Sequence, residues 1–285
     1  MKRYSLALMA LLVCLPFYAQ SFTDDVDRTD RKSHVVELRQ SAAASFSFNK
    51  KWDVGIREEI REVVFDSRND PMAYFSKSYT TVDAGWKCVS YTDTYNNYKY
   101  GLKLGAGYTL RYLNQKLHDS QGNVQSPSHY LRHRPFVTLT GSANFGMVKL
   151  TLRERFLADF RTDSVNTLEK PQCHMELRHR LTADFKIPGK TYKPFTYIEL
   201  ANTLNQPSLY DANGVKLYGG QYLCAVRAKL GLQWKIDTHN SLAFSYGFHW
   251  GQEREVNITK KGNVNRLYMD KTLKHVLTVA YEFGM

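Results

Sequence analysis

The side chains of this chain that are best suited to chemistry are basic residues spaced two apart. Arg153 and Arg155 form one such pair, and Arg178 and Arg180 form another. On a β-strand, residues two apart point to the same face, so each pair would present two guanidinium forks on one surface. Such forks bind carboxylates and other oxyanions. The chemistry predicted by these residues is therefore anion pairing, either with acidic side chains of the protein or with anions from solution.

Charged residues in this spacing recur along the chain, and the basic ones outnumber the acidic ones. The charge network that we predict consists of Arg57, Glu59, Arg61, Lys103, Arg132, Arg134, Arg153, Arg155, Asp159, Glu176, Arg178, Arg180, Asp184, Arg227 and Lys229. The same face also holds Lys99, Arg111, Lys149, Glu37, Asp53, Asp83 and Glu199. One hypothesis is a structural network in which arginines and carboxylates fill the interior. The other is a basic lumen that concentrates anions.

Histidine and serine residues provide no recognisable catalytic site. Ser245 and His249 share one face of a predicted strand, but residues four apart are separated by about 13 Å along a strand. That distance excludes the direct hydrogen bond that a nucleophile and its base need, unless another strand supplies the serine. His239 falls in a predicted turn, and His129 lies in a loop with no identifiable third partner. We therefore expect no catalytic residues.

No metal or cofactor motif accompanies the charged residues. The chain has no Gly-rich phosphate loop and no His-Glu metal motif, and residues 210–214 read as a hairpin tip without the ligands of a calcium loop. Cys88, Cys173 and Cys224 lack metal-ligand spacing and are too few for a disulfide scaffold. We interpret them as packing residues, and we expect no metal and no cofactor.

Strands must position these side chains, because polar and apolar residues alternate with a period of two. In residues 98–112 the aromatic and aliphatic side chains share one face, while Lys99, Lys103 and Arg111 share the other face with glycines. Residues 273–283 alternate in the same way and end on an aromatic side chain. The segments predicted as strands are 36–48, 52–65, 77–89, 98–112, 131–143, 147–161, 173–187, 192–204, 222–236, 242–250 and 273–283.

The lengths of these segments and of their connections favour a membrane barrel. A tilted strand needs about 9 to 11 residues to cross a bilayer, whereas strands of soluble proteins average about 5 to 6. Short connections at 49–51, 144–146, 188–190 and 237–239 alternate with long polar ones at 114–128, 162–172, 206–220 and 253–270. Short periplasmic turns and long extracellular loops are typical of outer-membrane barrels.

Two observations keep an alternative open. A soluble sandwich or a lipocalin-like barrel would show the same alternation with its apolar face inward. In addition, Glu58, Glu62 and Glu154 fall on the face that we assign to lipid. Strand length, loop asymmetry and aromatic strand ends favour the membrane barrel over the soluble one.

The N-terminal residues indicate the compartment. Lys2 and Arg3 precede an apolar run at residues 6–17 and the small residue Ala19, a pattern that predicts a secretory signal peptide. No later stretch reaches the roughly 20 apolar residues of a transmembrane helix. We therefore predict a signal peptide (1–19), an N-terminal polar segment (20–34) and a β-barrel (35–285) located in the cell outer membrane.

The number of strands needs an additional argument. The predicted segments number eleven, but bacterial single-chain barrels normally have an even number of strands. A turn at residues 83–85 would divide 71–91 into two short strands, giving twelve and placing both termini on the periplasmic side. If one outer segment does not join the barrel, the count is ten. We predict an all-β fold, an antiparallel transmembrane β-barrel of about 10 to 12 strands, with twelve favoured.

Several short motifs and their order point to a known family. The passages concerned are 52–61 (WDVGIREEIR), 98–101 (YKYG), 131–135 (LRHRP), 152–156 (LRERF), 176–180 (ELRHR), 199–200 (EL) and 281–283 (YEF). Over nearly the whole mature chain, this pattern resembles an uncharacterised family of Gram-negative outer-membrane β-barrels, a domain of unknown function. The resemblance implies insertion by the barrel-assembly machinery, which reads a C-terminal aromatic strand, here Val279, Tyr281 and Phe283. Gly284 and Met285 follow, so the chain departs from the usual terminal aromatic residue.

Charge limits the classes of partner. The net charge of +12 permits nucleic acid, anionic lipid or acidic solutes. Because the basic residues are spread along alternating strands, and no nucleic-acid-binding motif occurs, we exclude nucleic acid. The expected partners are outer-membrane lipid, the barrel-assembly machinery and small anionic solutes. The predicted function is a narrow anion-preferring pore; the alternative is a non-conducting structural barrel, and a lipid-modifying enzyme ranks third.

Overall fold

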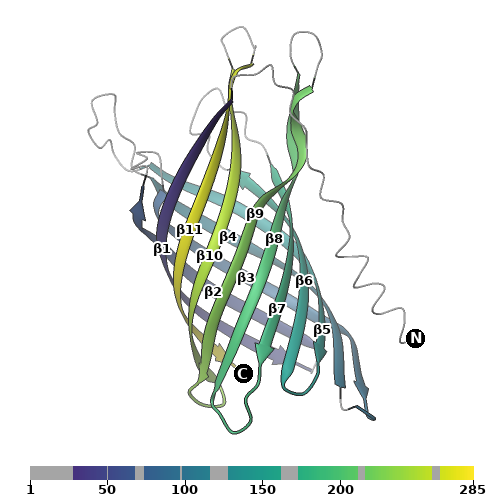
Figure 1. Ribbon diagram of the computed structural model, residues 1–285. Coiled ribbons are helices and arrows are strands. Elements are labelled where there is room, and N and C mark those ends of the chain that lie inside the picture. The colour runs from purple at the N-terminus through teal and green to yellow at the C-terminus, as the bar shows by residue number, and fades with distance from the viewer. Residues whose placement is uncertain are drawn as a thin grey trace.

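The computed structural model describes residues 28–49, 51–67, 74–96, 98–115, 128–161, 173–210, 216–258 and 264–285. They form one closed barrel of eleven strands (Figure 1). The strands are β1 (Arg28–Phe48), β2 (Trp52–Asp66), β3 (Tyr74–Asp93), β4 (Tyr98–Gln115), β5 (Ser128–Asn144), β6 (Val148–Arg161), β7 (His174–Phe185), β8 (Tyr192–Tyr210), β9 (Lys216–Lys235), β10 (Asn240–Ile258) and β11 (Val264–Gly284). Within the described ranges, no helix is long and apolar enough to cross a membrane. The predicted signal peptide lies outside them.

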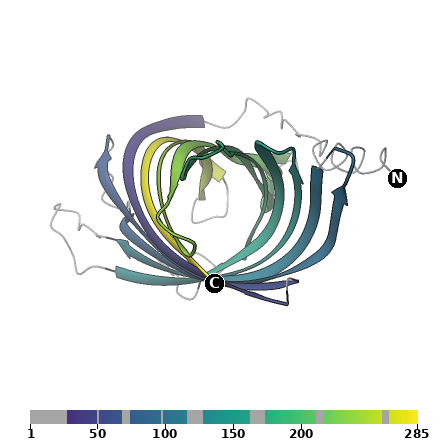
Figure 2. The ribbon, with the colours of Figure 1, turned by 90° about the horizontal axis from the view of Figure 1, so that it is seen from below.

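The barrel closes between its first and last strands, which run parallel. β1 pairs with β11 from Arg28 opposite Leu267 to Ser45 opposite Gly284, and the Met285 N–H donates to the Ser45 carbonyl at 2.9 Å. The other ten strand pairs are antiparallel neighbours in sequence. Figure 2 shows the resulting ring of strands in a view turned by 90°. Because β1 and β11 start at the same end, Arg28 and Gly284 lie at opposite ends of the barrel.

The favoured count of twelve strands is wrong, and so is the fully antiparallel sheet. Each of the eleven predicted segments corresponds to one strand, and no turn interrupts residues 83–85. β3 continues through this point, with Asp83 opposite Gly55 on β2 and Gly107 on β4. A turn there would leave backbone groups on both neighbouring strands without partners. An odd number of successive strands can close only with one parallel pair. The start of the first strand and the finish of the last strand then lie at opposite ends of the barrel.

The strands also extend beyond several predicted limits. β1 begins at Arg28, so residues 28–34 of the predicted polar segment belong to the barrel wall. β8 continues to Tyr210 and β10 to Ile258, so much of the predicted long loops at 206–220 and 253–270 is strand. Residues 20–27, and 116–127 and 162–172 of the other long loops, lie outside the described ranges.

The tight connections all lie at the end of the barrel where β11 finishes. Gly146 and Gly189 take positive φ angles of 84° and 71° there, a conformation that glycine adopts without steric cost. In the last of these turns, the Asn240 side-chain amide donates to Asp237 at 2.6 Å, and the backbone N–H groups of His239 and Asn240 donate to it at 2.7 Å. These hydrogen bonds hold the pKa of the Asp237 carboxyl below its usual range.

The two faces of the sheet differ sharply in polarity. Large apolar side chains project outward and remain exposed, such as Leu230 at 65 % and Ile56 at 49 %. The opposite face contains buried polar side chains, among them Glu37 and Thr203. The period of two in the sequence thus becomes an apolar outer surface and a polar inner one.

The outward-facing glutamates have polar neighbours on adjacent strands. Glu58 on β2 accepts hydrogen bonds from the hydroxyls of Ser78 and, at 2.6 Å, Thr80, both on β3. Glu154 on β6 is paired with His179 on β7. These glutamates are therefore real exceptions to the apolar outer face, and the structure gives two of them polar partners on the adjacent strand instead of turning them inward.

Candidate functional site

The charged side chains of the predicted network lie on the concave face of the barrel. Arg111 on β4 reaches Asp159 on β6, although β5 lies between them. Two strands apart in a sheet means about 10 Å between backbones. Such contacts form readily where side chains converge, on the inside of a curved sheet. On the outer face, the contacts of Glu58 and Glu154 described above join adjacent strands only.

Strand register brings one row of titratable side chains together across six strands. Arg153 is opposite Arg180, Arg180 is opposite Glu199, and Glu199 is opposite Arg227. The row continues through His249 on β10 to Lys274 on β11. It thus contains one carboxylate among several basic groups.

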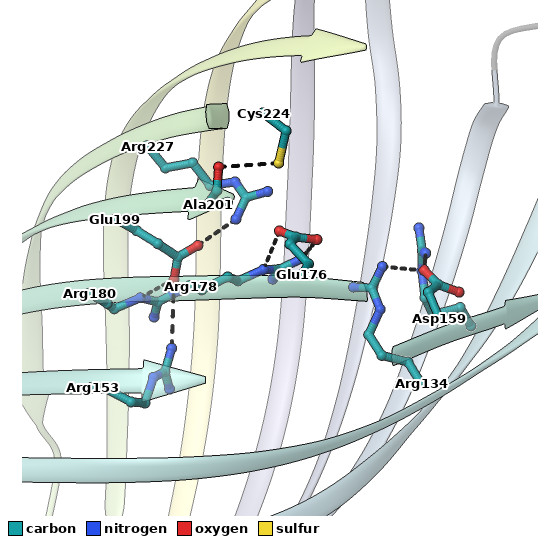
Figure 3. A network of polar contacts seen from close by, with 11 residues as sticks. Arg134, Arg153, Asp159, Glu176, Arg178, Arg180, Glu199, Ala201, Cys224 and Arg227 are labelled. Atoms are coloured by element: carbon teal, nitrogen blue, oxygen red, sulfur yellow. Dashed lines mark hydrogen bonds and ion pairs between the residues drawn. The ribbon is translucent and has the colours of Figure 1, made fainter. Parts of the chain in front are cut away.

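Glu199 is the centre of this row (Figure 3). One carboxylate oxygen, Oε2, accepts hydrogen bonds from Arg180, with Nη2 at 2.5 Å and Nε at 2.6 Å. Arg227 binds the other oxygen at 2.5 Å, and Arg153 Nη2 lies 3.8 Å from Oε2. Arginines from three strands therefore surround a single carboxylate on a fourth.

Two further carboxylates bind arginines in the same view (Figure 3). Arg178 donates to both oxygens of Glu176, at 2.7 and 3.0 Å. Asp159 accepts from Arg134 at 2.5 Å and also from Arg111. Each carboxylate is held by fixed guanidinium forks, an arrangement that gives strong, oriented hydrogen bonds.

A second cluster lies near the β1–β2 side of the barrel. Arg39 Nε donates to Glu37 at 2.5 Å, and the Arg39 guanidinium lies 3.4 Å from His249 Nδ1. Arg61 pairs with Glu59 and stacks on the Tyr79 ring at 3.9 Å. The ring face is electron-rich and attracts the cation, so Tyr79 fixes the position of Arg61.

In the inner-face pairs described above, the cation is more exposed than the carboxylate. The Glu199 side chain is 1 % exposed, whereas Arg153 and Arg180 are 27 % exposed and Arg227 is 23 % exposed. The same order holds for Asp159 with Arg111 and Arg134. The carboxylates therefore lie against the wall, and the surface that the interior presents is largely cationic.

The remaining predicted network residues occupy the inner face without joining the cluster at Glu199. Lys103 pairs with Asp53, and Lys229 Nζ donates to Thr278 at 3.3 Å. Arg57 on β2, Arg132 on β5 and Asp184 on β7 follow the same alternation. Asp184 forms no ion pair with any residue that the structure describes.

Three contributors to the inner face were not predicted from the sequence: Arg39, Tyr79 and Lys274. Arg39 alternates with Glu37, a signal that could have identified it. Lys274 comes within 4.0 Å of Glu37 only because β11 pairs with β1, a contact that no sequence pattern indicates. Tyr79 acts through its ring and its hydroxyl, which accepts from Arg111 at 3.3 Å.

The predicted assembly residues Val279, Tyr281 and Phe283 lie on the outer face of β11. Val279 and Tyr281 are exposed, and the Tyr281 hydroxyl donates to the Asn240 side chain. The Phe283 ring lies 6.3 Å from the His239 ring. The last strand thus presents an apolar, aromatic outer face at the turn end of the barrel.

The described residues contain no group of three or more His, Cys, Asp or Glu side chains that could hold a metal ion. His249 is buried and contacts Arg39. In the part of the chain described, no hydrogen bond links it to Ser245. The described inner face provides cationic hydrogen-bond donors, and the chemistry that such donors support is anion binding.

No protein-family model matches this chain, and no curated protein matches it either.

Proposed function

We propose that this chain is an outer-membrane β-barrel, as its resemblance to uncharacterised Gram-negative barrels implies, and that it forms a narrow, anion-preferring pore. In this proposal the N-terminal signal peptide directs export, and the aromatic last strand is recognised by the barrel-assembly machinery. Outer-membrane lipid then covers the outer face, and small anionic solutes enter the lumen.

The outer surface supports a membrane location. Contiguous apolar side chains remain exposed over the barrel wall, a property that soluble monomers rarely have over a large area. Aromatic rings gather toward the turn end, where Trp52 stacks on Trp86 at 6.2 Å and Tyr98 packs edge-on against Phe145 at 5.2 Å. Aromatic girdles are typical of the membrane–water interfaces of barrels.

The observation that carries the pore hypothesis is the covering of inner-face carboxylates by arginines. A solute in the lumen would meet guanidinium groups in front of Glu199, because that carboxylate is buried beneath them. Excess positive charge on a low-dielectric wall raises the local concentration of anions. The contacts around Glu199 and Asp159 also join strands that are adjacent or have one strand between them. They therefore follow the wall and do not cross the lumen.

Single-channel recording tests this function. The mature chain, refolded into a planar bilayer, should show conductance steps whose reversal potential under a salt gradient indicates anion preference. Arg153→Glu should shift that potential toward cations, because Arg153 lies on the inner face and is only loosely paired. Lys32→Glu, on the outer face of β1, makes the same charge change and should leave the potential unaltered.

A non-conducting structural barrel is the second candidate. The number of strands is compatible with it, because eleven is below the roughly 16 to 18 strands of open porins, and smaller barrels are filled by their own side chains. A heat-modifiable, protease-resistant barrel that gives no conductance would support this candidate and reject the pore.

A further inference from the structure

Four arginines on β6 and β7 face one another directly. Arg153 is opposite Arg180, and Arg155 is opposite Arg178. Directly opposed residues on antiparallel strands have Cβ atoms about 5 Å apart, and like charges in these positions destabilise the pair. Two consecutive inner-face pairs of this kind on the same two strands need compensating negative charge.

The acidic side chains supply only part of that charge. Glu176 binds Arg178, and Glu199 binds Arg180 and also Arg227. Together with Arg153 and Arg155 these make five arginines, and in the described part of the chain only the two carboxylates of Glu176 and Glu199 are available to pair with them. Arg153 remains at 3.8 Å from Glu199, and among the described residues Arg155 has no carboxylate within ion-pair distance.

Arg155 is nevertheless held in place. Its guanidinium stacks on the Phe136 ring at 4.2 Å, and Thr138 lies directly opposite it on β5. Its Nε is buried without a hydrogen-bond partner. Arg153 and Arg155 occupy the same face of β6, about 7 Å apart along the strand. Their donors are therefore oriented in advance and under-used.

We infer that Arg153 and Arg155, backed by Arg178 and Arg180, form a binding site for a phosphate-type oxyanion. Phosphate carries enough charge to compensate Arg155 and the loosely paired Arg153, and its several oxygens can accept from more than one guanidinium fork at once. Chloride carries only one negative charge and has no separate oxygens with which to accept from several guanidinium groups. This inference deepens the proposed function, since it names the class of anion that the lumen would select.

Inorganic phosphate binding to the refolded chain in detergent micelles tests the site without requiring conductance. Calorimetric titration should detect phosphate binding at an ionic strength fixed with chloride. Arg155→Gln should weaken that binding about tenfold or more, because a charged fork is lost. The variant breaks no ion pair in the described structure, so it should fold and should be at least as stable as the wild type without phosphate.

Two further variants make the test specific. Arg155→Lys keeps the charge but loses the fork, and it should bind phosphate with intermediate affinity. Lys149→Gln removes a charge from the same face of β6 near the turn, and it should change the affinity less than about twofold. Absence of phosphate binding to the wild type, or equal weakening in Lys149→Gln and Arg155→Gln, would overturn the inference.

The two proposals fail separately. Phosphate binding by a barrel that gives no conductance would retain the site and reject the pore. Anion-selective conductance without phosphate binding would retain the pore and reject the site.

Discussion

Glu199 shows how unequal the partners of one network can be. Its carboxylate is buried and accepts from two arginines at hydrogen-bond distance, whereas each arginine retains access to the lumen. Loss of the carboxylate leaves two guanidinium groups crowded together without a counter-charge. Loss of Arg153, which is 3.8 Å away, leaves the carboxylate bound by the other two. The central anion should therefore contribute more to stability than any single cation around it.

Glu199→Gln should lower the free energy of unfolding by about 2 to 3 kcal/mol, less than the full cost of breaking a buried pair because the arginines are partly solvated. Urea unfolding of the barrel in lipid vesicles measures this difference. Asp184→Asn is the control, since it removes an inner-face carboxylate that forms no ion pair among the described residues; its effect should stay within about 0.5 kcal/mol. Equal losses in both variants would contradict the central role of Glu199.

At the level of the strands, β6 and β7 combine an arginine-rich inner face with one polar pair on the outer face. Glu154 and His179 face outward and pair with each other through Glu154 Oε2, while Glu154 Oε1 is buried without a hydrogen-bond partner. In the lipid that we propose around the outer face, each polar group costs free energy, and the pair offsets only part of that cost. Removing both members should therefore destabilise the barrel less than removing one and leaving the other without its partner.

Replacement of both residues, Glu154→Leu with His179→Leu, should leave stability unchanged or raise it by up to about 2 kcal/mol. Glu154→Leu alone should lower stability by about 1 kcal/mol, because His179 then lacks its partner. Unfolding in vesicles compares the double variant with the two single variants. A double variant less stable than both would show that the pair has a further role.

Strand packing on the inner face also depends on a glycine. A Cβ at Gly231 would lie 2.6 Å from Phe195 Cζ and from Ser245 Cβ, and 2.7 Å from the Phe244 carbonyl oxygen. Gly231→Ala should therefore lower the free energy of unfolding by about 1 to 3 kcal/mol. At Gly251 the nearest atom would be 3.9 Å away, so Gly251→Ala should have an effect within about 0.5 kcal/mol. A neutral Gly231→Ala in the same unfolding assay would contradict this packing.

For the whole molecule, the defining feature is the parallel seam between β1 and β11. It accompanies an odd number of strands, and it places the start of β1 and the finish of β11 at opposite ends of the barrel. The seam is stabilised near the start of the two strands, where Arg31 donates to both oxygens of Asp270 at 2.6 and 2.5 Å. Closure of the barrel thus brings together residues 239 positions apart.

Disulfide cross-linking tests this closure. With Cys88, Cys173 and Cys224 changed to serine, the pair Ser41→Cys and Ala280→Cys should oxidise efficiently, because these residues are opposite each other in the parallel register. Neighbouring strands lie about 4.8 Å apart, within the Cα separation that a disulfide accepts.

The control pair combines Ser41→Cys with Thr272→Cys. Thr272 is opposite Ser33, eight positions away, so the two cysteines would be about 27 Å apart and should not cross-link. Mass spectrometry of the oxidised barrel identifies the linked peptides. A cross-link in the control pair, or none in the matched pair, would contradict the parallel seam.

The sequence by itself determined the elements and their two faces. Side-chain direction in a strand is a local property with a period of two, so residues such as Lys103 and Arg178 could be assigned to the polar face before any strand was paired. The eleven segments, their approximate centres and the positions of the tight turns follow from the same local pattern.

Only the tertiary structure decided the strand count, the parallel seam and the ion-pair partners. A shift of two residues between strands keeps every side chain on its face, so alternation cannot specify register. Register is fixed by hydrogen bonds between segments distant in sequence, and it alone places Glu199 beside Arg180 and Arg227. The same non-local bonding joined β1 to β11, which is why an expectation of an even count failed here.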